Sequence, residues 1–166
     1  MLGGLFQKQI ETKAQSQRLF SPVDGNVIPL AKVADPVFAQ GTLGRGFAIE
    51  PSDGLLYAPV SGKVTLIATT KHAIIFHQEN GLDVMLHLGL NTAPLQGTPF
   101  RIHVSDGQTI RGGKRIGYMN RAKISAAGDQ PTVIVVVTNA AEALTDLAVD
   151  YGPTVGGRQI GLMQAR

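Results

Sequence analysis

Short apolar segments that end at Gly, Pro, Asn or Asp make up most of the chain from Ser21 onward. β-Branched residues are common in these segments, and apolar and polar positions alternate in several of them, which is typical of strands. The expected strands are residues 23–30, 46–50, 62–68, 73–78, 84–88, 117–118 and 132–138. Residues 133–137 are apolar on both faces, as in a central strand of a sandwich. Helix is expected only over residues 94–100 and 141–147, so the pattern predicts an all-β domain.

The first twenty residues have a different pattern. Leu2, Phe6 and Ile10 recur at helical spacing among polar residues, although Gly3 and Gly4 weaken a helix. An amphipathic helix for a membrane surface or a partner and a flexible leader both fit this pattern. We therefore expect a leader over residues 1–19 and one domain over residues 20–166.

One short motif occurs twice in the chain. Residues 21–27 (SPVDGNV) are matched by residues 58–64 (APVSGKV). In each copy a proline leads into a strand, and a glycine permits a sharp turn or a bulge. The repeat predicts a duplicated hairpin motif.

Composition narrows the class of function. The 166-residue chain is 43% hydrophobic, which is enough for one sizeable core. It has no cysteine, which excludes thiol chemistry and fits a cytoplasmic location. The formal charge is +3, but the basic residues are scattered and Trp is absent, so nucleic-acid binding is not expected. No apolar segment is long enough to span a membrane, so we expect a soluble protein that meets membranes only peripherally.

The expected hairpin brings two of the four histidines together. If residues 73–78 pair with residues 84–88 around Asn80-Gly81, the numbers of opposing residues add to about 160. His72 and His87 then lie opposite each other within one residue of register. Alternation places His87 on the opposite face from three aliphatic residues, Val84, Leu86 and Leu88.

A histidine pair can bind a metal or handle a phosphoryl group. Zinc normally needs at least three protein ligands, and the chain has neither an HExxH nor a His-x-His motif. We therefore expect no intrinsic metal site and no cofactor. Phosphoryl transfer needs a neutral imidazole nucleophile, an acceptor that holds its other nitrogen, and nearby donors. His87, His72 and the Thr70 hydroxyl can supply that set, whereas His77 and His103 fit no motif.

Residues 70–73 (TKHA) and 81–92 (GLDVMLHLGLNT) closely resemble the paired histidine motifs of a known family. This family is the glucose-type enzyme IIA (EIIA) domain of the bacterial phosphoenolpyruvate-dependent sugar phosphotransferase system. Residues 34–39 (ADPVFA), 44–49 (GRGFAI) and 58–62 (APVSG) are similar to its segments around the active-site depression. The resemblance covers residues 20–166.

The resemblance implies an antiparallel β-sandwich or barrel-like fold and a phosphocarrier function in sugar uptake. His87 would accept the phosphoryl group, His72 would stabilise it, and Thr70 would give a supporting hydrogen bond. The small carrier HPr would be the donor and the IIB domain of a sugar permease the acceptor, and regulatory protein targets are also compatible. The implied partner-binding residues are Asp35, Val37, Phe38, Leu43, Met85, Leu88 and Asn91.

Two positions depart from the family's pattern. Asn91 stands where the family commonly has an acidic residue, and Ala68 stands at an aromatic rim position. The loss of an anion weakens attraction to a basic HPr surface and leaves Asp35 as the main acidic contact.

Two other classes stay open on the residues alone. A biotinyl or lipoyl module contains similar glycine-turned repeats, but it needs a lysine at a hairpin tip, typically between methionines. A zinc peptidase on a similar sheet architecture needs an adjacent His-x-His, whereas Leu88 and Gly89 follow His87.

Overall fold

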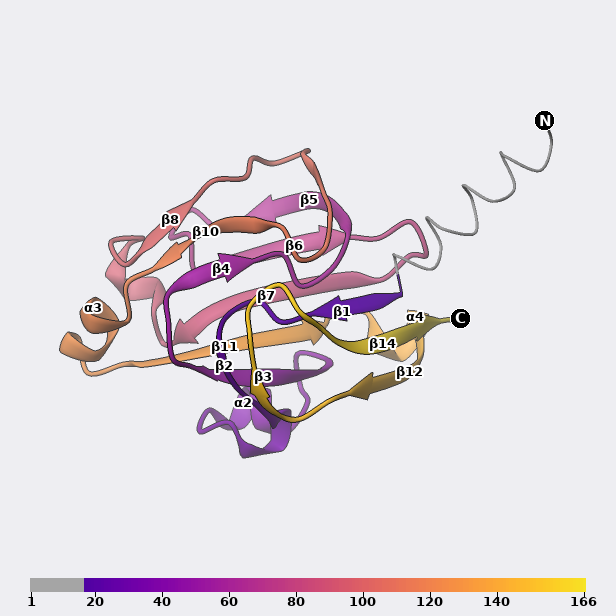
Figure 1. Ribbon diagram of the computed structural model, residues 1–166, viewed down its shortest axis with the longest axis horizontal. Helices are drawn as coiled ribbons and strands as arrows, with labels where there is room; N and C mark the ends of the chain where they lie inside the picture. Colours follow the sequence, from indigo (N-terminus) through magenta and orange to yellow (C-terminus); the bar gives the residue numbers. More distant parts are fainter. Residues whose placement is uncertain (1–16) are drawn as a thin grey trace.

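The computed structural model describes residues 17–166, and its largest element is an eight-stranded sheet (Figure 1). In order across the sheet its strands are β13 (Gly152–Thr154), β2 (Gly25–Pro29), β3 (Arg45–Pro51), β11 (Gln130–Val137), β7 (Asp83–Leu90), β6 (Ala73–His77), β5 (Gly62–Ile67) and β9 (Thr109–Ile110). One three-stranded sheet contains β1 (Arg18–Phe20), β14 (Gln159–Ala165) and β12 (Leu144–Val149). The other contains β4 (Leu55–Tyr57), β10 (Arg115–Met119) and β8 (Phe100–Ile102). Every strand pairing among the described residues is antiparallel, so the predicted all-β class is confirmed.

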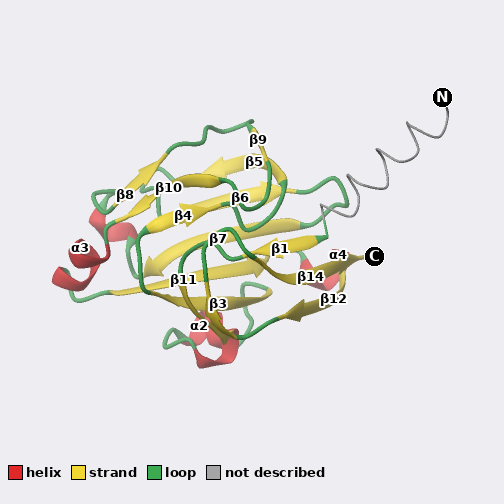
Figure 2. Cartoon of the chain, viewed as in Figure 1, coloured by secondary structure: helices red, strands yellow, loops and turns green. Residues whose placement is uncertain are grey.

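Helices are few and short (Figure 2). They are the 3₁₀ turns η1 (Leu30–Lys32) and η2 (Ala93–Leu95) and the α-helices α2 (Pro36–Ala39), α3 (Arg121–Ala126) and α4 (Ala140–Ala143). The helix predicted over residues 94–100 is wrong beyond η2, because Gln96 and Gly97 take left-handed φ angles of 55° and 79° that end the turn. The helix predicted over residues 141–147 stops at α4, and from Leu144 the chain pairs with β14 instead.

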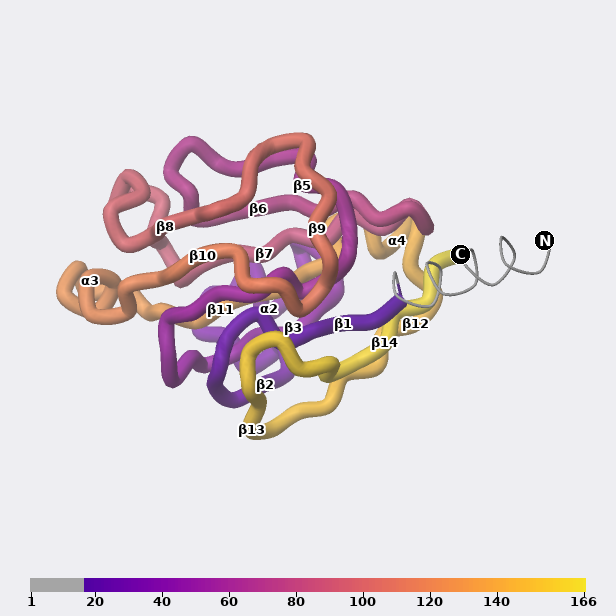
Figure 3. The backbone as a smooth tube through the Cα atoms, turned by 45° about the horizontal axis from the view of Figure 1, so that its top comes forward, coloured from indigo at the N-terminus to yellow at the C-terminus, as the bar shows by residue number. Residues whose placement is uncertain are grey.

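The main core lies between the large sheet and the two small ones. It takes in buried side chains from all three sheets, including Leu86 of β7, Leu56 of β4 and Met163 of β14. Each fully buried aliphatic side chain of this kind contributes about 1.5 to 3 kcal/mol relative to an exposed one. Strand β14 lies between β1 and β12, so the two ends of the described chain meet in one sheet (Figure 3).

A second apolar cluster lies on the outer face of the large sheet. Its buried members are Leu30, Val33, Phe38, Ala48, Leu90, Ile134 and Val136. The segment that carries η1 and α2 covers this face, which explains why β11 is apolar on both sides as predicted.

The hairpin of β6 and β7 has the predicted register. Ala73 lies opposite His87, so the numbers of paired residues add to 160. His72 is one position beyond this pair, and its carbonyl oxygen accepts a hydrogen bond of 2.7 Å from the Leu88 N–H.

The duplicated motif leads into β2 in its first copy and into β5 in its second. The proline of each copy also accepts a hydrogen bond from the residue just before the other copy. The Phe20 N–H donates to the Pro59 carbonyl, and the Tyr57 N–H donates to the Pro22 carbonyl, both at 2.8 Å. Because Phe20 ends β1 and Tyr57 ends β4, these bonds connect the two copies to the two small sheets.

The packed part of the chain starts before residue 20. Strand β1 begins at Arg18, and Leu19, which belongs to the predicted leader, is 1% exposed and lies in the main core. The leader's apolar positions Leu2, Phe6 and Ile10 lie outside the described residues.

Candidate active site

His87 projects from the outer face of the large sheet, near the end of β7. Its strand neighbours are Ala73 on β6 and Ile134 on β11, while Leu86 and Leu88 on either side of it point into the main core. This is the alternation that the sequence predicted. The imidazole is therefore half-buried on an apolar surface.

The backbone of Gly89 fixes the tautomer of His87. Nδ1 of His87 lies 2.9 Å from the Gly89 carbonyl oxygen, which can only accept a hydrogen bond. Nδ1 therefore carries the proton, and Nε2 of the neutral ring keeps a free lone pair. Gly89 has a φ of 78°, and a Cβ there would lie 2.5 Å from Thr92 Cγ2, so this turn requires glycine.

His72 stands against His87 across the hairpin. The ring centroids are 5.1 Å apart, with an angle of 81° between the planes. Nδ1 of His72 shares a hydrogen bond of 2.5 Å with the Thr70 hydroxyl oxygen. The structure thus brings together the three residues that the sequence singled out for phosphoryl chemistry.

Burial and the nearby His72, in that order, lower the pKa of His87 from 6.5 to about 4. The hydrogen bond to Gly89 and the charge of Asp35 oppose this with smaller effects. Burial also lowers the pKa of His72. Both rings are therefore neutral at pH 7, the state in which an imidazole nitrogen can act as a nucleophile.

Helix α2 supplies the other wall of the site. The Phe38 ring is 5% exposed, and its centroid lies 4.9 Å from that of His87 in an edge-on arrangement. Asp35 caps the helix, since its Oδ1 accepts a hydrogen bond of 2.8 Å from the Val37 N–H, and Pro36 occupies the first turn. The cap holds the Asp35 carboxylate close enough to influence His87.

The predicted partner-binding residues divide into three groups. Val37 and Leu43 are 45% and 40% exposed, and Asp35, Met85 and Asn91 also reach the surface. Phe38 is nearly buried against the His87 ring, so little of its surface is available to a partner. Leu88 is wrong as a contact residue, because it is completely buried in the main core on the opposite face of β7.

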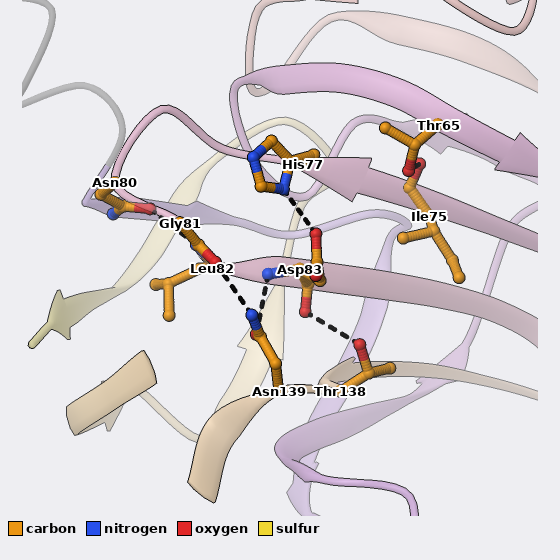
Figure 4. Close-up of polar contacts among 9 residues, drawn as sticks. All are labelled: Thr65, Ile75, His77, Asn80, Gly81, Leu82, Asp83, Thr138 and Asn139. Carbon is orange, nitrogen blue, oxygen red and sulfur yellow. Dashed lines mark hydrogen bonds and ion pairs between the residues drawn. The ribbon is translucent and has the colours of Figure 1, made fainter. Parts of the chain in front are cut away.

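The sequence analysis missed a hydrogen-bonded histidine–aspartate pair on the same face as His87. Nδ1 of His77 lies 2.6 Å from Oδ1 of Asp83, and the Asp83 backbone is held by Asn139 and Thr138 (Figure 4). The hairpin register contained the signal, because residues 77 and 83 also add to 160. Nδ1 of His77 thus forms a hydrogen bond with the carboxylate of Asp83, which lies on β7 four residues before His87.

Within residues 17–166, no group of three or more His, Cys, Asp or Glu side chains is arranged to hold a metal ion. In that same range no helix is long and apolar enough to cross a membrane.

Comparison with known proteins adds an independent observation. A family model described as the phosphoenolpyruvate-dependent sugar phosphotransferase system, EIIA 1, matches residues 17–143. The chain belongs to this family. A glucose-specific EIIA component from Oceanobacillus iheyensis is 36% identical over 129 residues, which cover 78% of each chain. The solved structure of glucose permease IIA from Mycoplasma capricolum superposes with a TM-score of 0.78 at 30% identity, over 87% of this chain and 94% of that one.

Some relatives of this EIIA-family chain are much longer. The glucose-specific EIICBA component of Streptococcus pneumoniae is 42% identical over 80% of this chain, which spans 18% of that relative. The raffinose carrier protein of Pediococcus pentosaceus is 42% identical over 87% of this chain, which spans 23% of it. None of these matches supports the biotinyl or lipoyl module or the zinc peptidase that the residues alone left open.

Proposed function

We propose that this EIIA-family protein carries a phosphoryl group on Nε2 of His87, receives it from phospho-HPr and passes it to the IIB domain of a sugar permease. The observation that carries this proposal is the state of the His87 ring. Gly89 holds the proton on Nδ1, burial keeps the ring neutral, and Nε2 is left as the nucleophile. We place the exchange in the cytoplasm, because the phosphoryl source of the family's system, phosphoenolpyruvate, is an intracellular metabolite.

The transfer step needs no metal or cofactor. The Nε2 lone pair attacks the phosphorus of the donor's phosphohistidine, so that one P–N bond forms as the other breaks and the donor imidazole leaves with the electron pair. Positive charge develops on the His87 ring, and the Gly89 carbonyl, which accepts from Nδ1–H, stabilises it. Delivery to the acceptor reverses these changes. The phosphoramidate keeps a high transfer potential, which a serine or threonine ester would lose.

His72 has a separate role in this proposal. If the Thr70 hydroxyl donates to Nδ1 of His72, the ring proton lies on Nε2, which can then donate to a phosphoryl oxygen. Such a bond is worth most in the transition state, where charge shifts between the two nitrogens. Thr70 thus positions the tautomer, and His72 stabilises the transferring group.

The acceptor is proposed from the longer relatives. One relative is named an EIICBA component and another an EIIBCA component, so a region similar to this chain occurs in one polypeptide with B and C parts. The relatives are named for glucose, raffinose and β-glucosides at similar identities. Family membership therefore supports the phosphoryl chemistry without selecting one sugar.

Reconstitution with phosphoenolpyruvate, enzyme I and HPr tests the proposal. Labelled phosphate should appear on the wild-type protein in an acid-labile, base-stable linkage and should be absent from His87→Gln. The matched control is His103→Gln, which removes an exposed histidine outside the site and should be labelled normally. Label on His87→Gln, or an acid-stable linkage, would overturn the assignment.

A further inference from the structure

Three non-glycine residues of the described chain, 17–166, have left-handed backbone angles. They are Lys71, Asn91 and Gln96, with φ angles of 57°, 59° and 55°. All three lie in two loops beside the histidine pair, one between β5 and β6 and the other after β7. A side chain with a Cβ disfavours this conformation, and such residues persist where the surrounding structure enforces them. Asn tolerates it best of the three, whereas Lys71 has no such preference.

Lys71 is the last residue of a tight turn over residues 68–71, and His72 follows it directly. The Lys71 N–H donates to the Ala68 carbonyl at 2.8 Å, and the Ala68 N–H donates to the Ala73 carbonyl at 2.9 Å. His72 is then held on its other side by the bond between its carbonyl and the Leu88 N–H. The backbone of His72 is therefore fixed by the turn before it and by β7 beside it.

The turn also makes the bond between Thr70 and His72 geometrically accessible. In extended backbone, residues two apart are separated by about 6.6 Å. The left-handed angle at Lys71 folds the chain back, so that the Thr70 hydroxyl reaches Nδ1 of His72 at 2.5 Å. The conformation of Lys71 thus determines which nitrogen of His72 is engaged.

The lysine side chain itself is exposed. Its stem approaches the second loop, where a Cβ placed on Gly97 would lie 3.5 Å from Lys71 Cδ. The charges that act on the pKa of His87 are those of His72 and Asp35. Lys71 therefore affects the site through its backbone conformation and not through its ammonium group.

We propose that Lys71 is a positioning residue, whose left-handed backbone sets the orientation and tautomer of His72 for phosphoryl delivery. This inference rests on the proposed function of the histidine pair. It predicts that the φ preference of residue 71, and not its charge, controls the rate of delivery.

Three substitutions separate conformation from charge. Lys71→Asn and Lys71→Gly remove the ammonium group but favour left-handed backbone, whereas Lys71→Val removes the charge and resists that conformation. Lys114→Val makes the same change at an exposed lysine with an ordinary backbone, outside the site. If Lys71→Val loses its thermal unfolding transition, Lys71→Ala provides the milder test of the same preference.

Two readouts distinguish failure of this inference from failure of the proposed function. Labelling of the wild type by phospho-HPr tests the proposed function itself. Given labelling, we expect Lys71→Val to deliver phosphate to IIB about tenfold more slowly, while Lys71→Asn and Lys71→Gly stay within about threefold of wild type. In ¹⁵N-histidine NMR spectra, Lys71→Val should shift the His72 ring nitrogens and leave the Nδ1–H signal of His87 in place.

Two results would overturn the inference. One is a rate and a His72 spectrum for Lys71→Val that match those of Lys114→Val. The other is equally slow delivery by Lys71→Asn, Lys71→Gly and Lys71→Val, which would assign the effect to the lysine side chain.

Discussion

At the scale of single residues, the proposed chemistry depends on how the two nitrogens of His87 differ. Nδ1 forms a hydrogen bond with the Gly89 carbonyl, so in the proposed mechanism a backbone atom two residues away leaves Nε2 as the nucleophile. Burial then keeps the ring neutral well below the pH at which an exposed imidazole becomes charged. His72 and Thr70 form a second hydrogen-bonded pair, and the His72 ring packs edge-on against that of His87.

The lowered pKa of His87 predicts a ring that stays neutral from pH 8 down to about pH 5. Because the unfolded chain binds this proton near pH 6.5 and the folded protein only near pH 4, acidification through that interval favours unfolding. The corresponding loss of stability is on the order of 3 kcal/mol and should be missing from His87→Gln. An NMR titration of the ring should give a midpoint near 4, and a midpoint above about 6 would contradict the described environment.

His72→Gln should separate accepting phosphate from delivering it. The amide keeps a donor at similar reach but loses the imidazole geometry, so we expect labelling by phospho-HPr and delivery to IIB slowed by about tenfold or more. Thr70→Val, which removes only the hydroxyl, should slow delivery in the same direction and by less. Rapid-quench measurement of each half-reaction checks this. Wild-type rates in both half-reactions for His72→Gln would show that His72 has only a structural role.

At the scale of elements, the hairpin of β6 and β7 brings the histidines together, and α2 covers them from the side. Helix α2 has only four residues and depends on its cap, because so short a helix has almost no stability of its own. The same carboxylate that caps it also acts on His87 and faces solvent. One side chain thus links local folding to the electrostatics of the site.

Substitutions of Asp35 should separate these two contributions. Asp35→Ala loses the bond to the Val37 N–H and should lower the free energy of unfolding by about 1 kcal/mol, whereas Asp35→Asn keeps a capping oxygen and should lose only a few tenths. Both variants remove the negative charge, so both should bind a basic HPr surface more weakly, and the difference from wild type should shrink at high salt. Denaturant unfolding and titration calorimetry measure the two effects. Equal stability of Asp35→Ala and wild type would exclude the capping role.

The hairpin that carries the two histidines was predictable because its sequence signals are strong, whereas helix α2, which forms the other wall of the site, was not predicted. A turn at Asn80-Gly81 and alternation in residues 84–88 were sufficient to predict the register that joins His72 to His87. Residues 144–147 of β12 were predicted as helix together with the good helix formers at 141–143, and pairing with β14 overrides that preference. Strands of two or three residues, such as β1, β4 and β9, carry too little pattern and form only because a partner strand is present. Leu88 was placed at the surface because it lies next to His87 in the motif, although alternation correctly points it inward.

At the scale of the whole molecule, the two faces of the large sheet have different roles. Its inner face packs against both small sheets and forms the main core, while its outer face holds the histidine pair beside the smaller cluster under η1 and α2. Val37 on α2 and Leu43, four residues after that helix, are exposed apolar side chains. Under the proposed function, a partner that docks on them can reach His87 on the outer face without disturbing the main core.

Leu19 tests whether β1 belongs to this architecture. It is almost completely buried between the sheets, so Leu19→Ala should lower the free energy of unfolding by about 2 to 5 kcal/mol. Leu162, on the neighbouring strand β14, is 52% exposed, and Leu162→Ala should change stability by no more than about 0.5 kcal/mol. Chemical denaturation of the two variants makes the comparison. Similar small losses for both would show that β1 contributes little to the core.

The most direct test of the central claim is NMR of the phosphorylated protein with ¹⁵N-labelled histidine. Phosphorus bonded to a ring nitrogen splits that nitrogen's signal, so the spectrum identifies both the residue and the atom that carry the phosphoryl group. Because Gly89 occupies Nδ1, we predict splitting of Nε2 of His87 with the Nδ1–H signal retained. Splitting of Nδ1 of His87, or of a nitrogen of His72, His77 or His103, would contradict the proposed mechanism.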